Sequence, residues 1–115
     1  MTVDAPSEVI VRYDGGAVGT EIWGMTQANF LVRLPGANAK DVAVMLNDAA
    51  ARVLAKALEQ EDTPEFRRAA VEHAGAYLVE KLANSGRYFS SALNLSEGVL
   101  DENPDILEHL KRTRV

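Results

Sequence analysis

Two ionisable side chains near the C-terminus have the spacing of an acid–base pair. Asp105 and His109 are four residues apart, so a helix would bring the carboxylate and the imidazole to the same face. In such a pair the carboxylate orients the imidazole, which accepts or donates a proton. No other feature supports catalysis, because the serines lack the Gly-x-Ser-x-Gly turn of a nucleophile and cysteine is absent. We therefore expect no catalytic residues, and an enzyme is the third-ranked function.

A glycine-rich segment comes close to the spacing of a phosphate-binding loop. Gly19, Gly24 and Thr26 occupy fixed positions of the P-loop pattern, but Met25 stands where that loop has lysine. The lysine supplies the charge that holds the β- and γ-phosphates, and the loop must lead into a helix. Here the residues that follow have the composition of a strand. We expect the glycines to serve turns or a bulge, and we expect no nucleotide cofactor.

The histidines and acidic side chains lack the spacing of a metal site. His73 lies beside Glu72 at the border of the apolar stripe of a predicted helix, and neither a His-x3-His nor an EF-hand pattern occurs. A cluster of acids stands at a predicted helix start, where carboxylates complement the helix dipole. We expect no metal and no other cofactor. The clustered acids are Asp101, Glu102, Asp105 and Glu108.

Large apolar side chains before residue 31 and after residue 86 are the candidates for protein contacts. Trp23, the single tryptophan, lies in the glycine-rich segment beside Gly24. Tryptophan combines a large apolar area with one hydrogen-bond donor, which makes it a frequent anchor at interfaces. Core packing is the first interpretation of Trp23, and an interface anchor is the alternative. The predicted interface residues are Ile22, Trp23, Met25, Phe30, Tyr88 and Phe89.

The composition indicates a single folded domain whose partners are proteins. Among 115 residues, 47% are hydrophobic and 25% are charged, which places the chain well away from disordered sequences. The net charge of −5 is spread along the chain, and this disfavours nucleic-acid binding, since phosphate contacts need a cationic surface. The absence of cysteine favours a reducing, cytoplasmic compartment. With no signal peptide and no bilayer-length apolar run, we expect neither export by that route nor a membrane partner.

The N-terminal third has the residue types of β-strands. Ser7 to Tyr13 and Asn29 to Leu34 carry alternating β-branched and aromatic residues, as half-buried strands do. Between them, Asp14-Gly15-Gly16 predicts a tight turn, so Ala17 to Trp23 should return as another strand. Pro35-Gly36 then breaks the pattern. We expect about three antiparallel strands before this point.

The remainder of the chain has mostly helical spacing. Apolar residues recur every three or four positions from Asn38 to Glu59, and again after a Thr63-Pro64 cap to Leu82. Within the second helix, Gly75 indicates either a close neighbouring backbone or a bend. Asn103-Pro104 predicts a short last helix. Residues 87–100 fit neither period, and a short helix or strand is expected there.

These elements predict a two-layer α+β domain spanning residues 1–115. Its β-rich part would cover residues 1–36 and its mainly helical part residues 37–115. An antiparallel pair of long helices, joined by a short connector, would cover the small antiparallel sheet. The sheet would keep two unpaired edges, which proteins protect by charge, covering or pairing.

The absence of chemical motifs makes a structural or interaction protein the leading function. We expect a non-enzymatic, homo-oligomeric subunit of a larger assembly, such as a viral or phage particle. The alternative is a regulator or inhibitor that captures a small ligand between protomers, using Arg33, Arg87 and Tyr88. Because the glycines, Trp23 and the open strand edges fall in residues 14–34, function is expected there.

Overall fold

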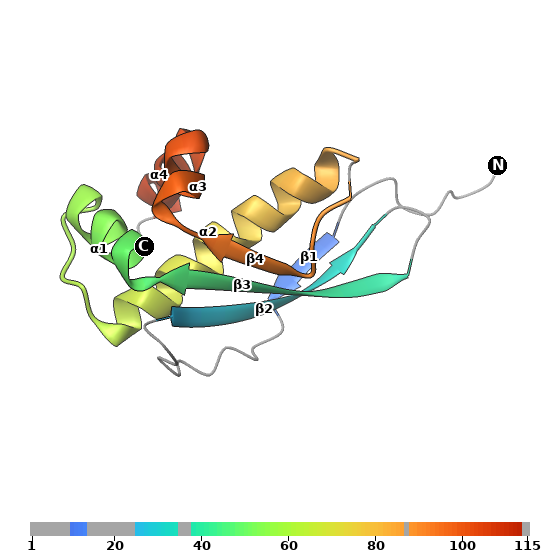
Figure 1. Ribbon diagram of the computed structural model, residues 1–115, viewed down its shortest axis with the longest axis horizontal. Coiled ribbons are helices and arrows are strands. Elements are labelled where there is room, and N and C mark those ends of the chain that lie inside the picture. The colour runs from blue at the N-terminus through green and yellow to red at the C-terminus, as the bar shows by residue number, and fades with distance from the viewer. Residues whose placement is uncertain (1–9, 14–24, 35–37, 87, 114–115) are drawn as a thin grey trace.

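The protein is built on one mixed sheet. The computed structural model describes residues 10–13, 25–34, 38–86 and 88–113, and in these ranges the strands lie in the order β1-β2-β3-β4 (Figure 1). β1 pairs antiparallel with β2, and β2 pairs antiparallel with β3, whereas β4 pairs parallel with β3. The strands are β1 (Ile10–Tyr13), β2 (Met25–Arg33), β3 (Ala39–Asn47) and β4 (Ala92–Leu95).

A layer of helices packs on one face of this sheet. The longest helix, α2, contacts β1, β2 and β3, while α1 contacts β3 and α3 contacts β4. Figure 1 shows α2 running along the sheet, with α1 at one end and α3 and α4 stacked over that end. The helices are α1 (Asp48–Ala57), α2 (Pro64–Asn84), α3 (Glu97–Glu102) and α4 (Pro104–Thr113). None of the helices in the described ranges is long and apolar enough to cross a membrane.

Side-chain caps fix where the helices begin. The Asn47 side chain accepts a hydrogen bond from the backbone N–H of Ala50, and the Thr63 hydroxyl accepts one from Phe66 at 3.0 Å. Each cap satisfies a backbone donor that the first helical turn leaves unpaired. Pro64 follows Thr63 at the first helical position, where its missing N–H costs nothing. The Thr63-Pro64 start of the second predicted helix is thus confirmed.

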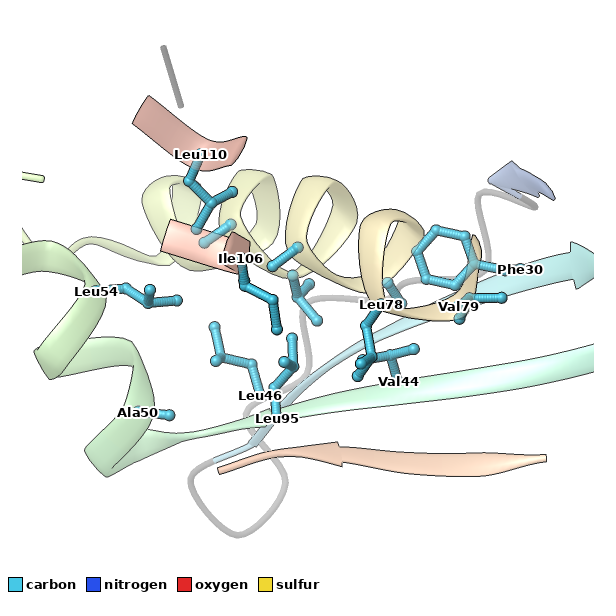
Figure 2. Packing of buried hydrophobic residues seen from close by; sticks show 14 of the residues in the cluster. Phe30, Val44, Leu46, Ala50, Leu54, Leu78, Val79, Leu95, Ile106 and Leu110 are labelled. Atoms are coloured by element: carbon cyan, nitrogen blue, oxygen red, sulfur yellow. The ribbon is translucent and has the colours of Figure 1, made fainter. Parts of the chain in front are cut away.

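Strict alternation along β2 and β3 separates a covered face from an open face. The even-numbered residues of both strands are buried from Thr26 to Val32 and from Val42 to Leu46, and the helices pack on them. This covered face joins Leu95 of β4 and apolar residues of the helices in one core. Figure 2 shows that core between the strands and the helices, including Phe30, Val44, Leu46, Ala50, Leu54, Leu78, Val79, Leu95, Ile106 and Leu110.

The predicted first helix is wrong in its N-terminal half. The helix was expected from Asn38 to Glu59, but residues 39–47 form β3 and only Asp48–Ala57 form α1. Val42, Val44 and Leu46 alternate in burial against β2, so pairing along nine residues outweighs the local three-and-four spacing. The change from strand to helix therefore occurs at Asn47 and not at Pro35-Gly36.

The coarse fold class is confirmed, and its details differ. The chain is an α+β protein, but the sheet has a parallel strand, β4, within the ambiguous residues 87–100. The expected strand 29–34 is the second half of β2, whereas the expected strand 17–23 lies outside the described residues. One long helix covers the sheet in place of an antiparallel pair, because α1 is only 10 residues long and sits at the end of β3.

Gly75 sets the distance between α2 and the sheet. A Cβ atom at this position would lie 2.9 Å from Cε2 of Phe30 and 3.3 Å from Cβ of Val44. The sequence pointed to a close backbone or a bend, whereas the close neighbour is the Phe30 ring. Only glycine permits this approach, which buries Phe30 completely beneath the helix.

Replacing Gly75 with alanine should destabilise the protein by about 1–2 kcal/mol, because an overpacking cost of about 2–3 kcal/mol exceeds the roughly 1 kcal/mol gained in helix propensity. Urea denaturation measures this free energy of unfolding. Gly98→Ala is the matched control, since its new Cβ would lie 3.8 Å from Oγ of Ser96, an ordinary contact. A Gly75→Ala protein as stable as wild type would contradict the proposed close packing.

Arg67 ties the start of α2 to the start of α1 and to the connector between them. Its guanidinium lies 2.7 Å from Oδ1 of Asp48 and 2.7 Å from both carboxylate oxygens of Asp62, with only 11% of the Arg67 side chain exposed. The hydrogen bonds from Arg67 lower the pKa of Asp48 and of Asp62. The same partners raise the pKa of Arg67.

The Arg67 contacts should make the protein acid-sensitive. Because both aspartates have folded-state pKa values below their ordinary 3.8, their stabilisation is present above that pH. It is lost as the pH falls through 3.8 and below. We expect Arg67→Met to be less stable near neutral pH and to lose less stability on acidification, as measured by urea denaturation at several pH values. Arg68→Met, whose partner Glu65 is 3.7 Å away on the exposed surface, should keep the wild-type pH dependence. Identical pH profiles for all three proteins would contradict this assignment.

Candidate functional site

The open face of the sheet is the most extensive candidate site. It is formed by the odd-numbered residues of β2 and β3 together with the even-numbered residues of β1 and β4, all opposite the buried set. The helices in the described ranges all join the core on the covered face. Antiparallel sheets often leave one face to water, and such faces are usually polar.

Apolar and polar residues alternate over the open face. Met25, Leu31 and Met45 are half-buried, and Ile10 of β1 is 46% exposed. Carboxamides lie between them, and the Gln27 Nε2 atom donates to Oδ1 of Asn29 at 2.9 Å. This mixture is typical of protein–protein interfaces, which are no more apolar than an average protein surface.

One cross-strand row of the open face carries opposite charges on either side of a leucine. The register pairs Arg12 of β1 with Leu31 of β2, and Leu31 with Asp41 of β3. Both charged residues are exposed. Within the ranges that the structure describes, neither Arg12 nor Asp41 has an ion-pair partner. The row is therefore positive on one side of Leu31 and negative on the other.

A hollow lies next to this row. Ala43 of β3 lines it together with Asn29, Asp41 and Ser91, and its volume is about 370 Å³. The open face is thus indented beside the exposed carboxylate of Asp41.

The structure separates the predicted interface residues. Met25 lies on the open face, whereas Phe30 is fully buried in the core and Phe89 is 7% exposed. These two phenylalanines therefore belong to the interior of the subunit and not to its surface. Ile22 and Trp23 lie outside the described residues, as does most of the segment 14–34 in which function was expected.

Tyr88 is the most exposed large apolar side chain of the described residues, at 91%. The ammonium group of Lys40 lies 5.0 Å from the Tyr88 ring centroid and 4.2 Å from that of Phe89, and it donates to the Phe89 carbonyl. Lys40 thereby holds the segment before β4 against β3. Arg33 and Tyr88 do not line the hollow beside Asp41 or the hollow between α2 and α4 that is described next. Arg87 lies outside the described residues. The role of these three residues in capturing a ligand stays a prediction.

A second polar group joins α2 to α4. The Tyr77 hydroxyl donates to Oδ2 of Asp105 at 2.8 Å, and Nζ of Lys81 donates to the same carboxylate at 2.9 and 3.1 Å and to Oδ1 of Asn103 at 2.8 Å. Tyr77, Lys81 and Asp105 line a hollow of about 290 Å³ together with Glu80 and Asn84. Lys81 and Tyr77 lower the pKa of Asp105.

Asp105 and His109 do not form the predicted acid–base pair, because each contacts other side chains. His109 stacks on the Tyr77 ring with centroids 4.5 Å apart, while the Asp105 carboxylate is engaged by Tyr77 and Lys81. Burial lowers the pKa of His109, and the nearby Arg112 and His73 side chains lower it further. The imidazole is therefore neutral near pH 7 and acts as a packing surface. Sequence spacing found Asp105 and His109 but missed Tyr77 and Lys81, which lie on another helix.

The Tyr77–Asp105 hydrogen bond should be visible in the titration of the phenol. The pKa of Tyr77 is raised above its ordinary 10.0, mainly by this bond and then by burial. We expect Asp105→Asn to lower the pKa of Tyr77 toward 10.0, measured by ultraviolet difference titration and assigned with Tyr77→Phe. Asn84→Ala is the control, because Asn84 lines the same hollow but bonds to the Glu80 carbonyl. An unchanged titration in Asp105→Asn would contradict the assignment.

Neither a metal-binding group nor a known relative indicates a further functional site in the described residues. In residues 10–13, 25–34, 38–86 and 88–113, no group of three histidine, aspartate or glutamate side chains is placed to hold a metal ion. Comparison of the chain with protein-family models, with curated proteins and with solved structures finds no match. The two surface features, the open face and the α2–α4 group, are therefore the basis for a functional proposal.

Proposed function

We propose that the protein is a non-enzymatic interaction protein that associates with copies of itself as a subunit of a larger assembly. The open face of the sheet is the proposed contact surface. One observation carries the proposal: the helices of the described ranges pack on the covered face, while Met25, Leu31 and Met45 stand on the opposite face.

Sheet-to-sheet packing is the physical basis of this proposal. Two sheets pack face to face at about 10 Å, with their side chains interdigitated and their strands aligned to within about 30°. The open face carries Leu31 between two exposed charged side chains near one end of β2, and the two methionines toward its other end. Such an arrangement supports association through apolar contacts flanked by polar side chains.

The α2–α4 group supports a structural role for the residues that otherwise suggested catalysis. Tyr77, Lys81 and Asp105 satisfy one another, and the His109 ring stacks on Tyr77. The carboxylate that would orient the imidazole in an acid–base pair is therefore bound by Tyr77 and Lys81 of α2. These contacts favour a function in docking α4 against α2.

The proposal is tested by the native mass of the protein. We expect sedimentation velocity over a range of concentrations to give species heavier than the 12.5 kDa subunit. Leu31→Lys should shift the protein toward the monomer, because it would place a charge at an apolar position of the contact. The free energy of unfolding of the variant should be measured in parallel to show that the subunit remains folded.

Val53→Lys is the matched control for this substitution. Val53 lies on α1 and is 43% exposed, so the variant adds the same charge at an apolar surface position away from the open face. Its mass distribution should equal that of wild type. A wild-type protein that stays monomeric at all concentrations would contradict the proposed function, as would equal effects of the two substitutions.

A further inference from the structure

We propose that two copies of this chain pack open face to open face about a two-fold axis parallel to β2. In this dimer Leu31 meets Leu31, and Arg12 of each copy faces Asp41 of the other. The inference rests on the proposed self-association and specifies the partner and the geometry. The observation behind it is the row Arg12–Leu31–Asp41, which the strand register fixes.

The charge order of this row makes it complementary to itself. A two-fold rotation about an axis along β2 exchanges the two sides of the row and turns the second copy toward the first. Each positive Arg12 is thereby placed over a negative Asp41, and the contact occurs twice. Symmetric dimers require this kind of self-complementary surface.

The same charges disfavour the other simple face-to-face arrangement. If the axis lay across the strands through this row, Arg12 would face Arg12 and Asp41 would face Asp41. Like charges brought together at an interface oppose association. The row therefore distinguishes between the two packings, in both of which Leu31 would meet Leu31.

The side chains around the row fit the chosen axis. Ile10 of one copy comes over Ala39 of the other, where the small residue leaves room for the larger one. Met25 meets Met25 at the far end of β2, and thioether side chains adapt well to such symmetric contacts. Arg33, at the exposed end of β2, would face Arg33 of the other copy, and this like-charge contact is unfavourable.

The size of the face indicates a reversible dimer. In this packing the nine residues of β2 face β2, and the four residues of β1 face the paired end of β3. At about 3.3 Å per residue and 4.8 Å per strand, the facing strands present roughly 270 Å² in projection. Interfaces that bury less than about 1,200 Å² in total are typical of transient complexes. We therefore expect the dimer to dissociate on dilution.

Charge reversal on the full-length protein tests this geometry. Arg12→Glu and Asp41→Arg should each raise the dimer dissociation constant about tenfold, because each dimer then holds two repulsive contacts. An equimolar mixture of the two variants should form a heterodimer near wild-type strength, since both contacts are again between opposite charges. The double variant should likewise regain homodimerisation. Sedimentation equilibrium measures all four dissociation constants.

Controls separate this effect from a change in net charge. Lys111→Glu on α4 and Asp101→Arg on α3 repeat the two charge changes on exposed positions away from the sheet, and they should leave dimerisation unchanged. Arg33→Gln should strengthen the dimer a few-fold, because it removes the like-charge contact. A packing with any other axis does not predict this combination of losses, rescue and gain.

The outcomes distinguish failure of the geometry from failure of the proposed function. A wild-type protein that is monomeric at every concentration overturns both. A wild-type protein that associates while Arg12→Glu and Asp41→Arg associate equally well overturns the geometry alone. So does a mixture of the two variants that fails to restore the dimer, because the reciprocal contact is then absent.

Discussion

The close contact between Gly75 and the Phe30 ring organises the rest of the structure. It lets the 21-residue helix α2 lie directly on the central strands, so that one helix contacts β1, β2 and β3. With α2 in this position, α1, α3 and α4 fill the end of the same face. The helices of the described ranges therefore bury only one face of the sheet and leave the opposite face uncovered.

Because side chains alternate along a pleated strand, the residues that build the core also determine which residues stand on the proposed contact surface. Each core residue of β2 and β3 is flanked by residues of the open face, so Phe30 in the core places Leu31 on the surface. Register then aligns Leu31 with Arg12 and Asp41. The charge row is thus a consequence of the same pairing that builds the core, and a register shift would abolish both. Ion-pair groups at Arg67 and at Asp105 stabilise the helices without taking part in this surface.

Local signals in the sequence were sufficient for the two helices that begin with a proline. Thr63-Pro64 and Asn103-Pro104 marked the starts of α2 and α4 because these signals act within one helical turn. β3 was missed because its apolar residues satisfy both a helical and an alternating period, and only pairing with β2 decides between them. β4 has four residues and depends on β3, which lies more than 40 residues away in the chain.

The candidate surface was predictable only in its general nature. An interaction role was predicted from the lack of chemical motifs and stays a prediction, and Met25, one of the candidates, lies on the open face. Phe30 was not a surface residue, because alternation directs its side chain toward α2. Arg12, Leu31 and Asp41 come from three strands, so their alignment required the register, which no local pattern contains. Tyr77 and Lys81 were missed for the same reason, since their partner Asp105 lies on a different helix.

The central claim, that the open face is where this protein meets its partner copy, is tested most directly by methyl NMR of protein labelled at methionine, leucine and valine. Spectra recorded over a dilution series should show concentration-dependent shifts for Met25, Leu31 and Met45 of the open face. The methyl groups of Val53 on α1 and of Leu54 in the core should not shift. Concentration-independent signals from the open face, or shifts confined to the helical side, would contradict the claim.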